Sequence, residues 1–178
     1  MASGSNIKGS LTKSCMVYTD TAPEGVSEAT QQALQDFSVQ WSEHPELGGY
    51  PGCLVSNEDW PKVFEALKTK GGFDMLVDHT AVDYPDRKPE RLTVLGLVMN
   101  LETQERLMVR TRVVDGGSIP TLCHLWKSAD WAERETFDMF GVTFDGHPDM
   151  TRIYLGQDFE GWPMRRDFPM QGHNRFRD

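Results

Sequence analysis

Cysteine is scarce in this sequence, and its few cysteines lie far apart. Cys15, Cys53 and Cys123 are the only three among 178 residues, and they form no Cys-x-x-Cys pair. An iron–sulfur cluster is normally held by four thiolates, so we expect no cluster on this chain alone. Isolated cysteines are also typical of a reducing, cytoplasmic compartment rather than of a secreted, disulfide-bonded domain.

Long apolar runs and basic charge are scarce as well. No apolar stretch approaches the roughly 20 residues that span a membrane, and residues 1–11 lack the apolar core of a signal peptide. These absences predict an intracellular chain without a membrane span. Lysine and arginine number 18 against 27 acidic residues, which gives a formal net charge of −9. That charge would repel phosphates and argues against a nucleic-acid partner.

Motifs that bind cofactors or perform catalysis are missing too. The sequence has no Gly-rich phosphate loop, no Rossmann fingerprint and no Ser/His/Asp arrangement. Glu133 and Glu135 diverge by about 200° around a helix and cannot share one ion. Only Glu135 and Asp138 form an i, i+3 pair, and with His147 as the one nearby histidine the zinc ligand set is incomplete. We therefore expect no catalytic residue, no cofactor and no metal on this chain.

The length of the chain suits one domain with appendages, of the α+β class. Residues 1–24 are rich in Ser, Thr, Gly and Lys and are expected to be a flexible lead-in. Residues 25–141 should form the α+β domain, and residues 142–178 an extended C-terminal arm. We expect a mixed, mostly antiparallel sheet that helices near 27–41 and 57–70 cover on one side.

Hydrophobic periodicity locates the strands of that sheet. Residues 91–100 are apolar on both faces, as in a central strand, and residues 106–113 alternate between apolar and Arg or Met side chains. The short connection between them predicts an antiparallel hairpin. Strands near 53–55 and 73–77 and a short helix at 120–126 are also expected. The stripe of Arg106, Arg110 and Arg112 is predicted to be a solvated face of the sheet.

A helix with clear end signals follows. Ser128 fits the N-cap, Asp130 lies in the first turn where the helix dipole favours an anion, and Gly141 follows the last periodic residue. Glu133 projects into the apolar arc of this helix. Its carboxylate therefore needs a cation or several N–H donors, from this fold or from another chain.

The outward face of the same helix carries a large aromatic residue among charges. Trp131 points there together with Arg134, Glu135 and Asp138. This combination is typical of the centre of an interface. The alternative is that Trp131 covers a neighbouring loop of its own chain.

Residues 142–178 show neither helical nor alternating periodicity, so no regular element is expected there. Nine large apolar side chains and five arginines argue against a solvated tail and match the composition of protein interfaces. Ordering such an arm costs roughly 1–2 kcal/mol per backbone residue. We expect another subunit to offset that cost, with the arm wrapped around it.

Residues 129–153 and 163–169 carry a long and specific motif, with resemblance also in the segment 78–84. The motif resembles the C subunit, the 30 kDa subunit, of the proton-pumping NADH:quinone oxidoreductase family, respiratory complex I. Met164 and Arg166 depart from the usual Leu and Lys of that family. The motif residues, which the resemblance implies are interface residues, are Trp131, Glu133, Arg134, Glu135, Asp138, Gly141, Phe144, Gly146, His147, Pro148, Arg152, Arg165, Arg166, Asp167, Phe168 and Pro169.

The resemblance implies a non-catalytic core subunit of the hydrophilic arm of that complex. It implies a C-terminal arm laid along the D subunit, which helps form the quinone site, and a domain beside the cluster-bearing B and I subunits. FMN, iron–sulfur clusters and quinone would be held elsewhere in the complex. The implied location is peripheral, on the cytoplasmic face of the inner membrane or on the matrix face in an organelle.

Three further expectations remain open at this point. Because the chain stops at Asp178, we expect it not to be the fused form in which the next subunit follows. The corresponding subunit of a membrane-bound hydrogenase-type complex is an alternative, since such complexes share the motif. A stand-alone metal hydrolase using Glu135, Asp138 and His147 is the alternative from a different class.

Overall fold

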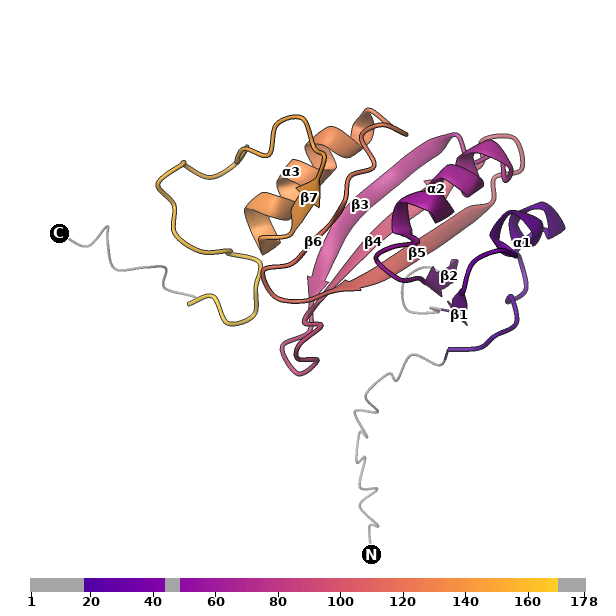
Figure 1. Cartoon of the computed structure of the whole chain (residues 1–178), viewed down its shortest axis with the longest axis horizontal. Helices are drawn as coiled ribbons and strands as arrows, with labels where there is room; N and C mark the ends of the chain where they lie inside the picture. The colour runs from indigo at the N-terminus through magenta and orange to yellow at the C-terminus, as the bar shows by residue number, and fades with distance from the viewer. Residues whose placement is uncertain (1–17, 44–48, 170–178) are drawn as a thin grey trace, which may run out of the picture.

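The computed structural model describes residues 18–43 and 49–169 (Figure 1). The main sheet has the strand order β1-β2-β5-β4-β3. Only β2 and β5 pair in parallel, and the other three pairings are antiparallel. The expected α+β class with a mixed, mostly antiparallel sheet is confirmed. The strands are β1 (Gln40–Glu43), β2 (Pro51–Leu54), β3 (Met75–Asp83), β4 (Leu92–Met99) and β5 (Arg106–Val113).

The hairpin predicted from periodicity is present, with β4 in the interior of the sheet and β5 beside it. β3 is longer than the strand expected at 73–77, because its pairing with β4 continues as far as Asp83 and Leu92. Beyond this sheet, β6 (Ser118–Pro120) pairs in parallel with β7 (Thr143–Asp145). β7 is a regular element inside the arm, where no periodicity predicted one.

The described chain contains three helices, of which α2 crosses in front of the sheet in Figure 1, α3 packs along β3, and α1 packs against α2. The helices are α1 (Glu28–Leu34), α2 (Trp60–Thr69) and α3 (Ser128–Phe140). α2 begins after Asp59, whose backbone N–H donates to Ser56 Oγ at 3.1 Å, so this helix starts later than the one expected near 57–70. Pro61 lies in the first turn, where its missing N–H costs nothing.

The core lies between the sheet and these helices. His79 of β3 pairs with Gly96 of β4, so both face the same side. The His79 ring lies 5.9 Å from the ring of Trp60 in α2 and 5.3 Å from that of Phe144 in β7, between centroids. A Cβ at Gly96 would lie 2.7 Å from Phe64 Cζ, so only glycine lets α2 approach this closely.

The first helix is shorter than predicted. α1 ends at Leu34, whereas Trp41 belongs to β1, where it pairs with Cys53 and bridges to Thr19. Pairing with two distant segments outweighs the weak helical periodicity of residues 35–41. Thr19 lies within the stretch expected to be a flexible lead-in, of which residues 1–17 lie outside the described part of the chain.

Two other sequence expectations are wrong. Residues 120–126 form a turn rather than a helix, because Pro120 ends β6 and is held in the small parallel sheet. The arginine stripe of β5 is not uniformly solvated, since Arg110 is 2% exposed. Arg110 donates to Ser42 Oγ and lies near the Tyr18 ring, so neighbouring side chains cover it.

Candidate functional site

The motif-bearing helix α3 packs along β3, and the chain after it turns back over the helix. Its N-cap is Lys127, one residue before the predicted Ser128, and Lys127 makes no side-chain capping bond. Its C-terminal end at Gly141 is as predicted, with φ 76°. A Cβ at Gly141 would also collide with the Trp162 ring. Glycine is therefore required both for the turn and for the return of the chain.

Glu133 is fully buried, and its carboxylate is satisfied within its own chain. Leu122 N–H donates to Oε1 at 2.6 Å, and Thr121 Oγ–H donates to Oε2 at 2.6 Å. Desolvation by burial nevertheless raises the pKa of Glu133, and these donors oppose that shift. The sequence left open whether the partners of Glu133 come from this chain or from another one. In the structure, the donors come from the loop before α3 of this chain. No cation within 4 Å pairs with Glu133 among the described residues.

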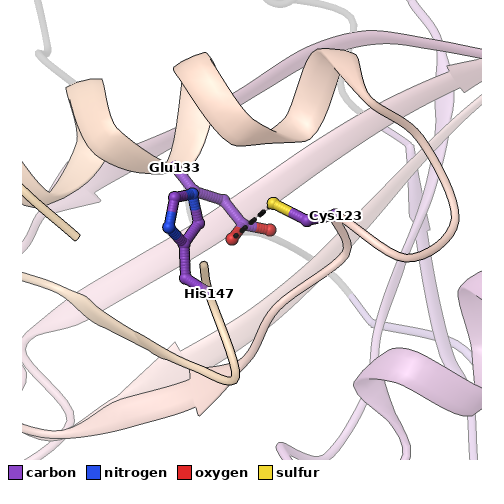
Figure 2. Close-up of side chains that lie close together, drawn as sticks. All are labelled: Cys123, Glu133 and His147. Carbon is purple, nitrogen blue, oxygen red and sulfur yellow. Dashed lines mark hydrogen bonds between the residues drawn. The ribbon is translucent and has the colours of Figure 1, made fainter. Parts of the chain in front are cut away.

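Cys123, Glu133 and His147 lie around one point between α3, the preceding loop and the turn after β7 (Figure 2). Their potential ligand atoms are within 4.8 Å of one another. His147 Nδ1 accepts the Asp149 N–H at 3.0 Å, so in the neutral ring Nε2 carries the proton, which faces the Asp130 carbonyl at 3.2 Å. Desolvation by burial raises the pKa of Cys123 to about 11. Within this group, the Cys123 thiol donates to Glu133 Oε2 at 3.6 Å.

Asp138 is the main departure from the predicted helix faces. It was assigned to the outward polar face, yet it is 0% exposed. Its Oδ2 accepts three successive backbone N–H groups, from Ile153 (3.1 Å), Tyr154 (2.8 Å) and Leu155 (3.1 Å), and Oδ1 accepts from Arg152 at 2.7 Å. Desolvation would raise the pKa of Asp138, but these hydrogen bonds outweigh it and lower the pKa.

A second buried carboxylate fixes the end of the described arm. Arg91 Nε and Nη2 donate to Asp83 at 2.5 and 2.7 Å, while Nη1 and Nη2 donate to Asp167 at 2.7 Å each. Arg166 N–H also donates to Asp83, at 2.7 Å. The hydrogen bonds from Arg91 lower the pKa values of both carboxyl groups. Sequence reasoning did not single out Asp83 and Arg91 as site residues, although Asp83 lies in the segment 78–84 that resembles the family and Arg91 borders a central strand.

Arg165 and Trp162 complete the docking of the arm. Arg165 Nε donates to the Phe140 carbonyl at 2.6 Å, and Nη1 pairs with Asp115 at 2.6 Å. The Trp162 ring lies 5.3 Å from that of Phe137, between centroids. The arm therefore has extensive contacts with its own domain as far as residue 169. Another subunit is therefore not the only source of contacts for this stretch, while residues 170–178 lie outside the described residues.

The predicted interface residues divide into three groups by exposure. Buried residues are Glu133, Asp138, Gly141 and Phe144. Partly buried residues are Arg134, His147, Arg152, Arg165 and Phe168. Arg134 donates to Thr151, and Phe168 stacks on Phe159. Exposed residues remain on the outer surface, namely Trp131, Glu135, Gly146, Pro148, Arg166, Asp167 and Pro169.

The outer surface of α3 presents two large aromatic residues. Trp131 is 64% exposed and Tyr154 is 66% exposed. Arg134 lies 5.3 Å from the Trp131 ring centroid, and Tyr154 Oη donates to Glu135 at 3.4 Å. Within the described residues, Trp131 therefore leaves most of its surface uncovered by its own chain. Glu135, Asp138 and His147 have separate partners, so the hydrolase set proposed from sequence is not assembled. Within the described residues, no helix has the length and apolar character needed to cross a bilayer.

Comparison with known proteins places these features in one family. Residues 53–174 match the family described as respiratory-chain NADH dehydrogenase, 30 Kd subunit. The C subunit of NADH-quinone oxidoreductase from Geobacter metallireducens is 34% identical over 150 residues, covering 84% of this chain and 93% of that protein. The corresponding C subunit of Hyphomonas neptunium is 42% identical over 105 residues, covering 59% of this chain. The match spans only 52% of the Hyphomonas protein, about half of its length.

Two further similarities bear on the setting of the chain. The C/D 2 subunit of Aquifex aeolicus NADH-quinone oxidoreductase is 36% identical over 149 residues, covering 84% of this chain but 24% of that protein. A chain of the membrane-bound sulfane sulfur reductase, an archaeal respiratory membrane complex, superimposes with a TM-score of 0.66 at 26% identity. That superposition covers 79% of this chain and 83% of the other. With a family match across more than half of its length, this chain belongs to the family of the 30 kDa subunit of respiratory-chain NADH dehydrogenase.

Proposed function

We propose that this chain is a non-catalytic scaffold subunit of the hydrophilic arm of a proton-pumping NADH:quinone oxidoreductase. The observation that carries this proposal is the docked arm, which together with α3 displays Trp131, Tyr154 and Met164 at 64%, 66% and 58% exposure on a rigid support. Exposed aromatic and Met side chains around buried ionic anchors have the composition of a protein interface. The carboxylates that could serve chemistry are occupied in holding that surface together.

The scaffold would act by fixing distances between redox subunits. Electron transfer to quinone needs donors and acceptors held in a set geometry, and a redox-inactive chain can supply that positioning. Asp138 and Asp83 support this role, because Asp138 accepts three backbone N–H groups at one end of the returning segment and Asp83 accepts the Arg166 N–H at the other. The arm is thus ordered before a partner binds, which lowers the entropy cost of association.

The D subunit is the proposed neighbour of the arm, and the cluster-bearing B and I subunits are the proposed neighbours of the domain. The name of the Aquifex relative, which joins C and D, favours proximity of these two subunits. The proposed location is peripheral, on the cytoplasmic face of the inner membrane or the matrix face in an organelle. A second candidate is the equivalent subunit of a related energy-converting complex, favoured by the similarity to the sulfane sulfur reductase chain. The subunit composition of the native assembly discriminates between the two.

The isolated full-length chain should be colourless and free of metal and flavin. The three cysteines of the sequence cannot form a four-thiolate cluster site. Elemental analysis and an absorption spectrum after refolding from denaturant check this expectation. Stoichiometric iron, zinc or flavin in the refolded protein would contradict the scaffold role.

Ending the chain after Asp149 should leave a folded domain but prevent its incorporation into the complex. This cut keeps Val142 and Phe144, which are 0% and 2% exposed in the core, and removes the arm beyond β7. A cut after Gly141, at the domain boundary expected from the sequence, would strip these core residues and confuse unfolding with lost binding. The measurement is the amount of tagged chain recovered with the other subunits of the complex.

The matched control for this truncation is a chain ending after Pro169, which retains every described contact of the arm. Thermal unfolding of both isolated truncated chains separates folding from assembly. Full incorporation of the chain that ends after Asp149 would contradict the proposed role of the arm.

A further inference from the structure

The face of the main sheet that points away from α2 and α3 carries apolar side chains of β3 and β4 around the exposed Asp78, which pairs with Leu97. In β4, Val94 and Val98 enter the core, so the alternate residues point to the opposite face. Met75 pairs with Met99 across the strands, which places both on that face. We define the open-face patch as Met75, Val77, Leu95, Leu97 and Met99.

The open-face patch is accessible to solvent. Met75 and Val77 are 44% and 41% exposed, and the three β4 residues are partly exposed. Among the described residues, α2 and α3 lie on the other side of the sheet. The remainder of this face is closed by the chain itself, since Thr93 and Arg110 are only 4% and 2% exposed. An apolar area left bare beside a covered one is typical of a docking surface.

Arg106 gives the open-face patch a charged border. It pairs with Met99 in the neighbouring strand, and Nη1 donates to Tyr50 Oη at 2.6 Å. None of the ion pairs among the described residues includes Arg106. In a chain with a net charge of −9, this side chain offers a positive site next to apolar surface. A partner with an apolar row and a flanking carboxylate would complement both.

The form of the strand at the edge favours a helix over an added strand. β3 is the outer strand, and its register shifts between Leu76 and Asp78. A bulge and a charged side chain at an edge both oppose strand addition. The patch extends over two adjacent strands, about 5 Å apart, a width that suits the apolar stripe of one helix.

We propose that the open-face patch binds an amphipathic helix of a neighbouring subunit, with an acidic side chain of that helix paired to Arg106. This inference rests on the proposed function, because it presumes a multi-subunit assembly. It adds a second interface on the side of the sheet opposite to α3 and the arm. The chain would then join two neighbours across its sheet instead of serving as the support of one.

Leu97→Lys in the full-length tagged chain tests the open-face patch. The charge would be forced into the apolar contact, so we expect about a ten-fold or greater loss of chain recovered in the complex, equivalent to about 1.4 kcal/mol. Val114→Lys is the matched control, because Val114 is also apolar and 46% exposed but follows β5 at the far end of the hairpin. Both variants should unfold at the wild-type temperature. Equal recovery of Leu97→Lys and Val114→Lys would overturn the inference.

A photo-crosslinking residue in place of Met99 identifies the occupant within the assembled complex. The expected product joins Met99 to a helical peptide of another subunit that carries an acidic residue beside its apolar row. A crosslink to a second copy of this chain, to a strand or to nothing above the level of a Val114 crosslinker would overturn the inference. If the wild-type chain itself failed to recover complex subunits, the proposed function would be contradicted. If only the inference about the open-face patch is wrong, the wild-type chain still recovers those subunits.

Discussion

Asp138→Ala should release the returning segment from α3. The substitution leaves the backbone N–H groups of Ile153, Tyr154 and Leu155 and the Arg152 charge without their shared acceptor. Removing one partner of a buried, hydrogen-bonded charge costs about 3–5 kcal/mol. Because the arm can reach water by undocking, we expect the cost to appear as local unfolding of residues 150–169.

Hydrogen exchange measures this effect at the three amides themselves. Their protection should fall by at least about two orders of magnitude, the factor that 3 kcal/mol provides, while amides of β4 remain protected. Asp138→Asn retains one acceptor oxygen and should give a smaller loss. Asp149→Ala is the control, since its carboxylate is 59% exposed and pairs with Arg134 only at 3.7 Å, and such pairs contribute little. Unchanged protection in Asp138→Ala would show that the carboxylate does not hold the segment.

The strongest local signals of the sequence predicted the fold correctly. β4 was located because its segment is apolar on both faces, β5 because its residues alternate, and the end of α3 because a left-handed cap at Gly141 requires glycine. Trp41 was misassigned to a helix because its partners, Thr19 and Cys53, are distant in the sequence. Pairing of short edge strands leaves little trace in local periodicity.

The candidate site was predicted only where a single helix carries the information. Glu133 was recognised as buried because it interrupts an apolar arc, but its donors come from a loop that the sequence assigned to a helix. Asp138 was placed outside because a helical wheel does not register a chain that returns over its polar side. Arg91 binds Asp83 and Asp167, which lie 8 and 76 positions away in the sequence. Only the folded topology brings these three residues together.

His79 should make the stability of the domain sensitive to mild acid. It is completely buried between aromatic rings, and neither ring nitrogen has a hydrogen-bond partner among the described residues. Desolvation by burial lowers its pKa from 6.5 to about 4. Between these values the unfolded chain binds a proton that the folded chain excludes. The contribution is therefore fully present above pH 6.5 and is lost as the pH falls toward 4, with a total of about 3 kcal/mol.

His79→Leu removes this titration and fills the same apolar site, so the variant should be more stable than the wild type, and increasingly so as the pH falls. Other groups titrate in acid as well. Burial raises the pKa of Glu133, which opposes the loss, and the hydrogen-bonded Asp138 loses its contribution only at lower pH. Because both groups are present in the variant, the difference between the two unfolding curves isolates His79.

Denaturant unfolding at pH 7 and pH 4.5 measures that difference, and His124→Gln, at an exposed histidine, should follow the wild-type profile. If the difference in unfolding free energy between the wild type and His79→Leu did not change with pH, the imidazole would be solvated or paired in the folded protein. In that case α2, β3 and β7 would not enclose the His79 ring as tightly as their ring contacts require.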